Sequence, residues 1–164
     1  MNLVIDIGNS RTKVAIFDQN KMVKSFLFDD LTTVGLKEIL QEFQGTKRAI
    51  LSSVASVDPF LYDDLKAAFS FFLEVNNQTP MPMKIKYRTP ETLGLDRLAA
   101  AIGAREIFPD RDLLVIDAGT AITFDLIERE GTFLGGNISP GLKTRFRALH
   151  EFTQNCLLQK RQIS

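Results

Sequence analysis

The chain has little cysteine, little histidine and no excess charge of either sign. It contains one cysteine, Cys156, so an internal disulfide is excluded. Twenty basic residues balance 20 acidic residues, so no net basic field would gather nucleic acid. No apolar run reaches the roughly 18 to 20 residues that cross a bilayer. We therefore expect no nucleic-acid or membrane partner, and a small-molecule ligand instead.

The length and composition predict an ordinary globular domain. Of the 164 residues, 45% are hydrophobic, which is enough for a real core. No positively charged leader followed by an apolar stretch opens the chain, so we expect a cytoplasmic protein.

The most informative feature is a short pattern that occurs twice. Residues 3–10 read LVIDIGNS and residues 114–121 read LVIDAGTA. In each copy an apolar, β-branched run ends at an aspartate, a glycine follows, and a second apolar strand comes next. A buried strand that ends in Asp-x-Gly is suited to hold an anion or a cation, since glycine admits a ligand close to the backbone.

The hydrophobic pattern elsewhere predicts helices and strands in alternation. We expect helices at residues 33–44, 58–69, 95–108 and 142–158, hairpins at 2–17 and 113–127, and single strands at 49–51, 71–75, 83–87 and 132–134. Asp58 followed by Pro59 is typical of a helix start, and Gly45 of a helix end. The predicted fold is α/β with mixed sheets and a cleft between two similar halves.

The first hairpin has the parts of a phosphate cradle. Gly8 lets the backbone approach a ligand, and Lys13 supplies a point charge for a terminal phosphate. Hydrogen-bond donors follow the glycine at Asn9, Ser10 and Thr12. Asp6 can reach a phosphate-bound Mg²⁺ directly or through water. In the alternative interpretation these are only turn residues and a strand-end acceptor, but the second copy of the pattern favours a ligand site.

Paired carboxylates also serve glycoside hydrolases and aspartic proteases, but those mechanisms do not require a lysine and hydroxyls beside the first acid. Phosphoryl transfer does require them, together with a group that orients or deprotonates the acceptor hydroxyl. Asp96 is the candidate base, and Arg97 can pair with an oxyanion of the substrate. Alternatively, Asp96 is a first-turn helix acid and Arg97 a solvated side chain.

Together these motifs resemble the type III pantothenate kinases, members of the actin-like, sugar-kinase and Hsp70-like ATPase superfamily. Five segments carry the resemblance in order: residues 6–10 (DIGNS), 52–54 (SSV), 94–97 (GLDR), 117–121 (DAGTA) and 135–141 (GGNISPG). The resemblance covers residues 1–153 and implies a duplicated, ribonuclease H-like ATPase fold. The first actin-like half would span residues 1–110 and a partial second half residues 111–164.

The resemblance also implies an activity. Such kinases use ATP to phosphorylate pantothenate to 4'-phosphopantothenate, the first step of coenzyme A biosynthesis, and we expect a homodimer. Family members are usually longer, and residues 154–164 depart from the family pattern, so we expect a second half that is truncated at its C-terminus.

Site residues follow from the matched motifs. ATP phosphates and their Mg²⁺ would be held by Asp6, Ile7, Gly8, Asn9, Ser10, Arg11, Thr12, Lys13 and Thr120. Pantothenate would be contacted by Tyr87, Gly94, Leu95, Asp96 and Arg97, with Asp96 as the catalytic proton acceptor. Asp117 would bind a monovalent cation, K⁺ or NH₄⁺, near the dimer interface.

Two other interpretations stay open. The chain could be a catalytically impaired, truncated remnant or a regulatory nucleotide- or pantothenate-binding relative of the Bvg accessory factor type. It could also be a sugar-kinase-like enzyme with a different alcohol acceptor, although the segment at residues 87–97 argues against that.

Overall fold

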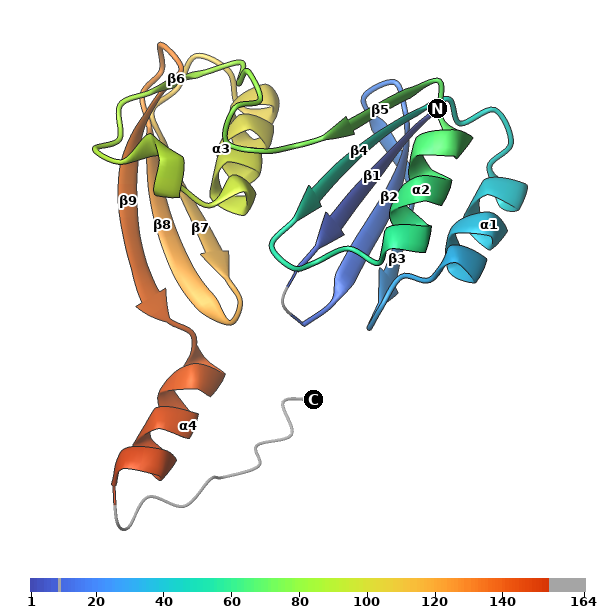
Figure 1. Ribbon diagram of the computed structural model, residues 1–164. Coiled ribbons are helices and arrows are strands. Elements are labelled where there is room, and N and C mark those ends of the chain that lie inside the picture. The colour runs from blue at the N-terminus through green and yellow to red at the C-terminus, as the bar shows by residue number, and fades with distance from the viewer. Residues whose placement is uncertain (9, 154–164) are drawn as a thin grey trace. The chain divides into compact units, whose positions relative to one another are not determined.

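The computed structural model describes residues 1–8 and 10–153 of the chain. By packing, the chain divides into two units, Met1–Thr79 and Pro80–Ser164, here called the first and the second unit (Figure 1). Each unit is built on one sheet that contains both parallel and antiparallel strand pairs. The predicted α/β class with mixed sheets is therefore confirmed. No helix in the described part of the chain is both long and apolar enough to cross a membrane.

The first unit contains a five-stranded sheet in the order β3-β2-β1-β4-β5. Its elements are β1 (Asn2–Ile7), β2 (Thr12–Asp18), β3 (Lys21–Phe28), α1 (Thr33–Glu42), β4 (Arg48–Ser53), α2 (Pro59–Ala68) and β5 (Phe71–Glu74). The first three strands form an antiparallel meander, and β4 joins β1 in parallel. The expected cap of α2 is confirmed, because the Asp58 carboxylate accepts hydrogen bonds from the N–H groups of Phe60 and Leu61, at 2.9 and 3.0 Å.

The core of the first unit lies between this sheet and its two helices. Alternate residues of β1 and β2 point to one face of the sheet, as the period of a strand requires. Leu3 and Ile5 are among them and are completely buried. They share one hydrophobic cluster with Leu36 of α1 and Leu65 of α2, so both helices cover this face.

The second unit contains a four-stranded sheet in the order β6-β9-β8-β7. Its elements are β6 (Lys84–Ile85), the short 3-10 helix η1 (Pro90–Thr92), α3 (Leu95–Ile107), β7 (Leu113–Ala118), β8 (Ala121–Ile127), β9 (Thr132–Pro140) and α4 (Leu142–Phe152). Leu98 and Ala101 of α3 are buried in one cluster with Ile127 and Phe133, and Val115 packs against it. In contrast, α4 has no buried residue and projects away from the sheet of its unit (Figure 1).

The structure corrects the expected secondary structure at two strands. The strand β3 was not predicted, because most of its residues are exposed and give no alternating pattern. The prediction ended β9 at Leu134, whereas the strand continues to Pro140. Residues 154–164 lie outside the described residues, and with them Cys156 and the expected end of the last helix.

The border between units also differs from the expected border at residue 110. In packing terms α3 belongs with the second sheet, since it contacts β7 and β8. The packing border therefore falls between Thr79 and Pro80. As a border between two actin-like halves of the sequence, residue 110 stays a prediction.

The repeated sequence forms an antiparallel hairpin in both units, but the pairing of the second hairpin is shifted by one residue because its turn is one residue shorter. In the first, Leu3 pairs with Ile16 and Ile5 with Val14. In the second, the corresponding pairs are Leu114 with Leu126 and Ile116 with Phe124. The burial is opposite, because α3 covers the Val115 face of its sheet and leaves the alternate residues of β7 exposed.

Candidate functional site

The first Asp-x-Gly turn brings a carboxylate and an ammonium group together at the end of β1. Asp6 and Lys13 are cross-strand partners, and the Lys13 Nζ lies 3.9 Å from the Asp6 Oδ2. The turn between them is closed by a 3.0 Å hydrogen bond from the Gly8 N–H to the Arg11 carbonyl. Both charged side chains are well exposed. A ligand that carries negative charge and a bound cation could therefore contact both groups.

The other predicted cradle residues take different positions. Thr12 is 2% exposed, whereas Ser10 and Arg11 are exposed. The Ile7 side chain belongs to the core, and its carbonyl accepts a 3.0 Å hydrogen bond from the Val54 N–H. That bond places the SSV segment beside the hairpin. The remaining predicted residue, Asn9, lies outside the described residues.

The second Asp-x-Gly turn, in the second unit, is held by the start of α4. The Thr120 carbonyl accepts hydrogen bonds from the Gly141 N–H and the Thr144 hydroxyl, both at 2.9 Å. A side chain at Gly141 could not fit, because its Cβ would lie 2.2 Å from the Gly119 carbonyl oxygen. The last glycine of the GGNISPG segment thus packs directly on this turn. Asp117, at the end of β7, is exposed.

The GLDR motif forms the first turn of α3. Gly94 is the N-cap and offers no side chain for capping. Asp96 accepts a 2.9 Å hydrogen bond from the backbone N–H of Arg97, one of the first-turn donors that have no partner within the helix. A Cβ on Gly94 would lie 2.4 Å from the Asp96 Oδ1. The glycine therefore makes room for an exposed carboxylate that folds back on the helix start.

Arg97 points the other way, into the unit, where it meets Asp125 of β8. The two side chains are 6% and 1% exposed. The Arg97 Nε lies 3.1 Å from each carboxylate oxygen of Asp125, and the Nη2 also donates to Oδ1. Hydrogen bonding to Asp125 raises the pKa of Arg97 above its ordinary value, although burial opposes the shift. This bidentate pair joins the start of α3 to the centre of the sheet.

Tyr87 completes this cluster of the second unit. Its ring meets Phe133 edge to face, with 6.4 Å between centroids. It also lies against Gly135, where a Cβ would come within 2.7 Å of the ring. Interaction with the side chain of Tyr87 adds to the raised pKa of Arg97. The structure thus brings Tyr87, Arg97 and the GGN segment together, with Asp96 next to Arg97 on the exposed side.

The sequence analysis missed Asp125. A signal was available, because Asp125 lies on the same strand face as Ile127, where an apolar residue is expected. A carboxylate at such a position requires a partner in the core.

Comparison with known proteins identifies the family that carries these motifs. The family model of type III pantothenate kinases matches residues 2–162. The chain belongs to the type III pantothenate kinase family. A type III pantothenate kinase of Phocaeicola vulgatus is 42% identical over 153 residues, which cover 93% of this chain and 63% of that protein. One of Christiangramia forsetii is 42% identical over 157 residues, covering 94% and 64%.

A solved structure is similar in sequence and fold. A Campylobacter jejuni protein described as a Baf family transcriptional activator is 26% identical, with a TM-score of 0.51, and the match covers 93% of this chain and 61% of that one. The chain therefore spans less than two thirds of the length of these type III pantothenate kinases and of this neighbour.

The described residues of this type III pantothenate kinase family member offer few ligands for a cation. Among residues 1–8 and 10–153, no group of three or more histidine, cysteine, aspartate or glutamate side chains could hold a metal ion. Asp6 fits a Mg²⁺ that arrives with a nucleotide, because the phosphates and water supply the other oxygen ligands. Near Asp117, the Thr120 carbonyl is already engaged by two hydrogen bonds, so a cation there would use side-chain oxygens and ligands from outside this turn.

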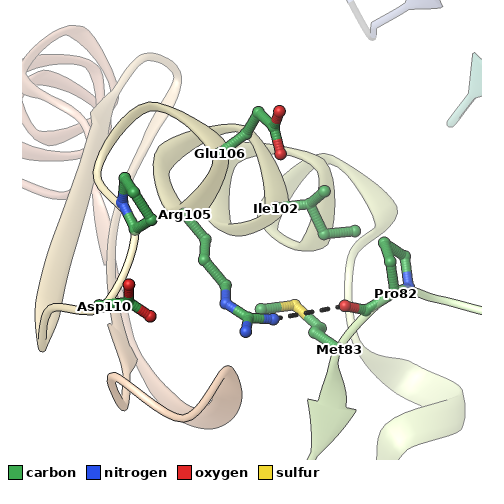
Figure 2. Close-up of a pocket in the computed structure, with 7 residues that line it drawn as sticks. Pro82, Met83, Ile102, Arg105, Glu106 and Asp110 are labelled. Atoms are coloured by element: carbon green, nitrogen blue, oxygen red, sulfur yellow. Dashed lines mark hydrogen bonds between the residues drawn. The ribbon is translucent and has the colours of Figure 1, made fainter.

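A hollow of about 460 Å³ lies at the other end of α3, away from the family motifs. Figure 2 shows Arg105 reaching across it toward the Pro82 carbonyl, at 3.5 Å. Met83, Ile102, Glu106 and Asp110 also line it, and none of the predicted site residues does. Arg105 packs over the turn at Gly131 as well, where a Cβ would lie 2.1 Å from the guanidinium. The arrangement fits a role of Arg105 in packing.

Proposed function

We propose that this chain carries the nucleotide and acceptor motifs of an ATP-dependent pantothenate kinase. The reaction would convert pantothenate to 4'-phosphopantothenate, the first step of coenzyme A biosynthesis. The observation that best supports the acceptor role is the exposed Asp96 carboxylate, held at the start of α3 by the Arg97 N–H. Membership of the family supplies the class of substrate.

On the donor side, Lys13 would pair with the terminal phosphate of ATP, as a point charge suits. Asp6 would hold the Mg²⁺ directly or through water, and this ion, when bound, neutralises charge on the phosphates. The 3.9 Å spacing of Asp6 and Lys13 supports the assignment, because both groups can face one polyphosphate. Thr120, on the second Asp-x-Gly turn, is proposed as a further phosphate contact.

On the acceptor side, Asp96 would take the proton of the pantothenate hydroxyl. As that oxygen bonds to the γ-phosphorus, the bond from this phosphorus to the β–γ bridging oxygen breaks and ADP leaves. Tyr87 and residues 94–97 would contact pantothenate, since they form one cluster in the second unit. In this assignment Asp96 is the base of the acceptor motif, and its neighbour Arg97 is anchored by Asp125.

Three finer features belong to the same proposal. A K⁺ or NH₄⁺ ion would bind at Asp117, which ends β7 with an exposed carboxylate. The active form would be a homodimer, and the protein would be cytoplasmic.

Phosphoryl transfer is tested with the purified chain, Mg²⁺, K⁺, ATP and pantothenate, with 4'-phosphopantothenate detected by mass spectrometry. Asp96→Asn should lower the turnover about 100-fold or more, because general-base catalysis contributes on this order. Glu106→Gln is the matched control, since Glu106 is an exposed acid on the same helix, away from its start. Equal turnover of Asp96→Asn and wild type would refute the assignment of the base.

A second candidate function rests on the length of the chain, which spans 63% of the Phocaeicola relative. A chain of this length could bind nucleotide or pantothenate without turnover, as a catalytically impaired remnant or a regulatory relative would. Calorimetry with each ligand separates the two candidates. If this chain binds but makes no product, while a version extended to the length of the relatives does, the activity belongs to the longer protein.

A further inference from the structure

A buried ion pair connects the acceptor motif to the sheet of its unit. Arg97 follows Asp96 in the chain, and its backbone N–H holds the Asp96 carboxylate at 2.9 Å. Its side chain extends from the same residue to Asp125 on β8. One residue therefore contacts both the exposed carboxylate and the anchor in the core.

Leu93 and Leu98 are buried beside the first turn of α3, but apolar contacts of this kind are not directional. The N-cap of α3 is Gly94, which makes no side-chain capping bond. Glycine also leaves the backbone more freedom than any other residue at this point. Within the described chain, Arg97 and Asp125 are the only buried charged residues. The hydrogen bonds of this pair are thus a directional contact between the first turn of α3 and β8.

A buried ion pair is a costly way to fill a core, because two charges lose their hydration. Apolar residues of similar volume often stabilise a fold equally well or better. Its geometry is what distinguishes the pair, since a guanidinium that donates through both Nε and Nη2 is fixed in orientation as well as in position. Such a contact suits Arg97, because its neighbour Asp96 must be placed accurately.

We propose that Asp125 is a positioning residue of the acceptor site, which orients Asp96 through the side chain and backbone of Arg97. The expected effect on pantothenate binding, with ATP binding unchanged, rests on the proposed function. Tyr87 packs beside this pair, against Phe133 and Gly135. The nucleotide hairpin at Asp6–Lys13 has no residue in this cluster.

The test compares Asp125→Asn with Asp112→Asn in the chain as it stands. Asp112 also pairs with an arginine of the second unit, Arg129 at 2.9 Å, but both side chains are exposed. Nuclear magnetic resonance on the ligand-free protein follows the side-chain carboxyl carbon of Asp96 and the backbone amide of Arg97. Calorimetry on the same samples measures the affinities for pantothenate and for ATP.

We expect Asp125→Asn to shift both resonances and to weaken pantothenate binding about 10-fold to 100-fold, the range that misplacement of a site group produces. ATP affinity should stay within about twofold, and Asp112→Asn should change neither the resonances nor the affinities. Unchanged resonances in folded Asp125→Asn would overturn the inference, as would equal weakening of both ligands.

Two further outcomes are distinguishable. If the wild-type chain binds no pantothenate, the proposed function fails for this chain, whereas the resonances still decide whether Asp125 positions Asp96. If Asp125→Asn does not fold, Arg97→Lys replaces it, because lysine keeps the charge and loses the two-point contact. That variant should shift the Asp96 resonance, and an unchanged resonance would overturn the inference.

Discussion

Ile5 and Ile116 occupy the same position in the two copies of the repeated motif, yet Ile5 is completely buried and Ile116 is 55% exposed. Each lies on the first strand of an antiparallel hairpin, and the pairing of the second hairpin is shifted by one residue. The difference comes from the helices, because α1 and α2 cover the Ile5 face, whereas α3 covers the opposite face of its own sheet. The same residue type at equivalent positions of the repeat is therefore expected to contribute differently to stability.

Alanine substitution at the two isoleucines should show this difference. Ile5→Ala should lower the free energy of unfolding by about 2 to 5 kcal/mol, because it leaves a cavity in a closed core. Ile116→Ala should change it by no more than about 0.5 kcal/mol, since the side chain already faces solvent. Denaturant unfolding followed by circular dichroism measures both. Equal losses of unfolding free energy would contradict the exposure of Ile116 on the second sheet.

The two glycines of the α3 segment make a second matched pair. Gly94→Ala should displace the Asp96 carboxylate, which lies 2.4 Å from the added Cβ, and lower turnover about 100-fold. Gly103→Ala meets nothing within 4 Å, so it should leave turnover unchanged and stabilise the helix by about 0.5 to 1 kcal/mol. Kinetics and thermal unfolding of both variants check this, in the extended chain if turnover requires it. Normal turnover of Gly94→Ala would show that Asp96 tolerates displacement.

The exposed pair Asp112 and Arg129 predicts a dependence of stability on pH. Hydrogen bonds from the Arg129 side chain and backbone lower the pKa of Asp112 below its ordinary value. A lowered folded-state pKa gives stability that is fully present above the unfolded pKa and is lost as the pH falls through the folded value. Asp112→Asn should therefore be less stable than wild type at pH 7, with the difference shrinking as the pH falls below about 4. Urea unfolding at several pH values measures it, and a difference that does not vary with pH would exclude the ion pair as its cause.

Much of this architecture could be predicted from local patterns. The apolar runs at β1, β2, β7 and β8, the Asp58 cap and the alanine-rich α3 each follow a regular period or a known end signal. The strand β9 continued beyond its prediction because Gly135 and Gly136 resemble turn residues. Gly136 instead stays in the sheet, where its Cβ would lie 1.6 Å from the Phe124 carbonyl oxygen. Such close approach of two strands is not visible in a hydrophobic pattern.

The candidate site was less predictable than the fold. The GLDR motif singled out Asp96 and Arg97, but no local pattern relates Arg97 to Asp125, which lies 28 positions further along the chain. Only the folded sheet brings Asp125 under the first turn of α3. Likewise, a resemblance places Asp117 in a cation site, and its role stays a prediction until a cation is bound.

The order of strands in each sheet has a consequence for synthesis of the chain on the ribosome. All five strands of the first sheet and both of its helices lie within residues 1–79, so this unit can fold once that segment has emerged. In the second sheet, β6 pairs with β9 through Lys84 and Thr132, and the intervening strands must be made first. The nascent chain should therefore acquire protease resistance in its first hairpin well before its GLDR motif.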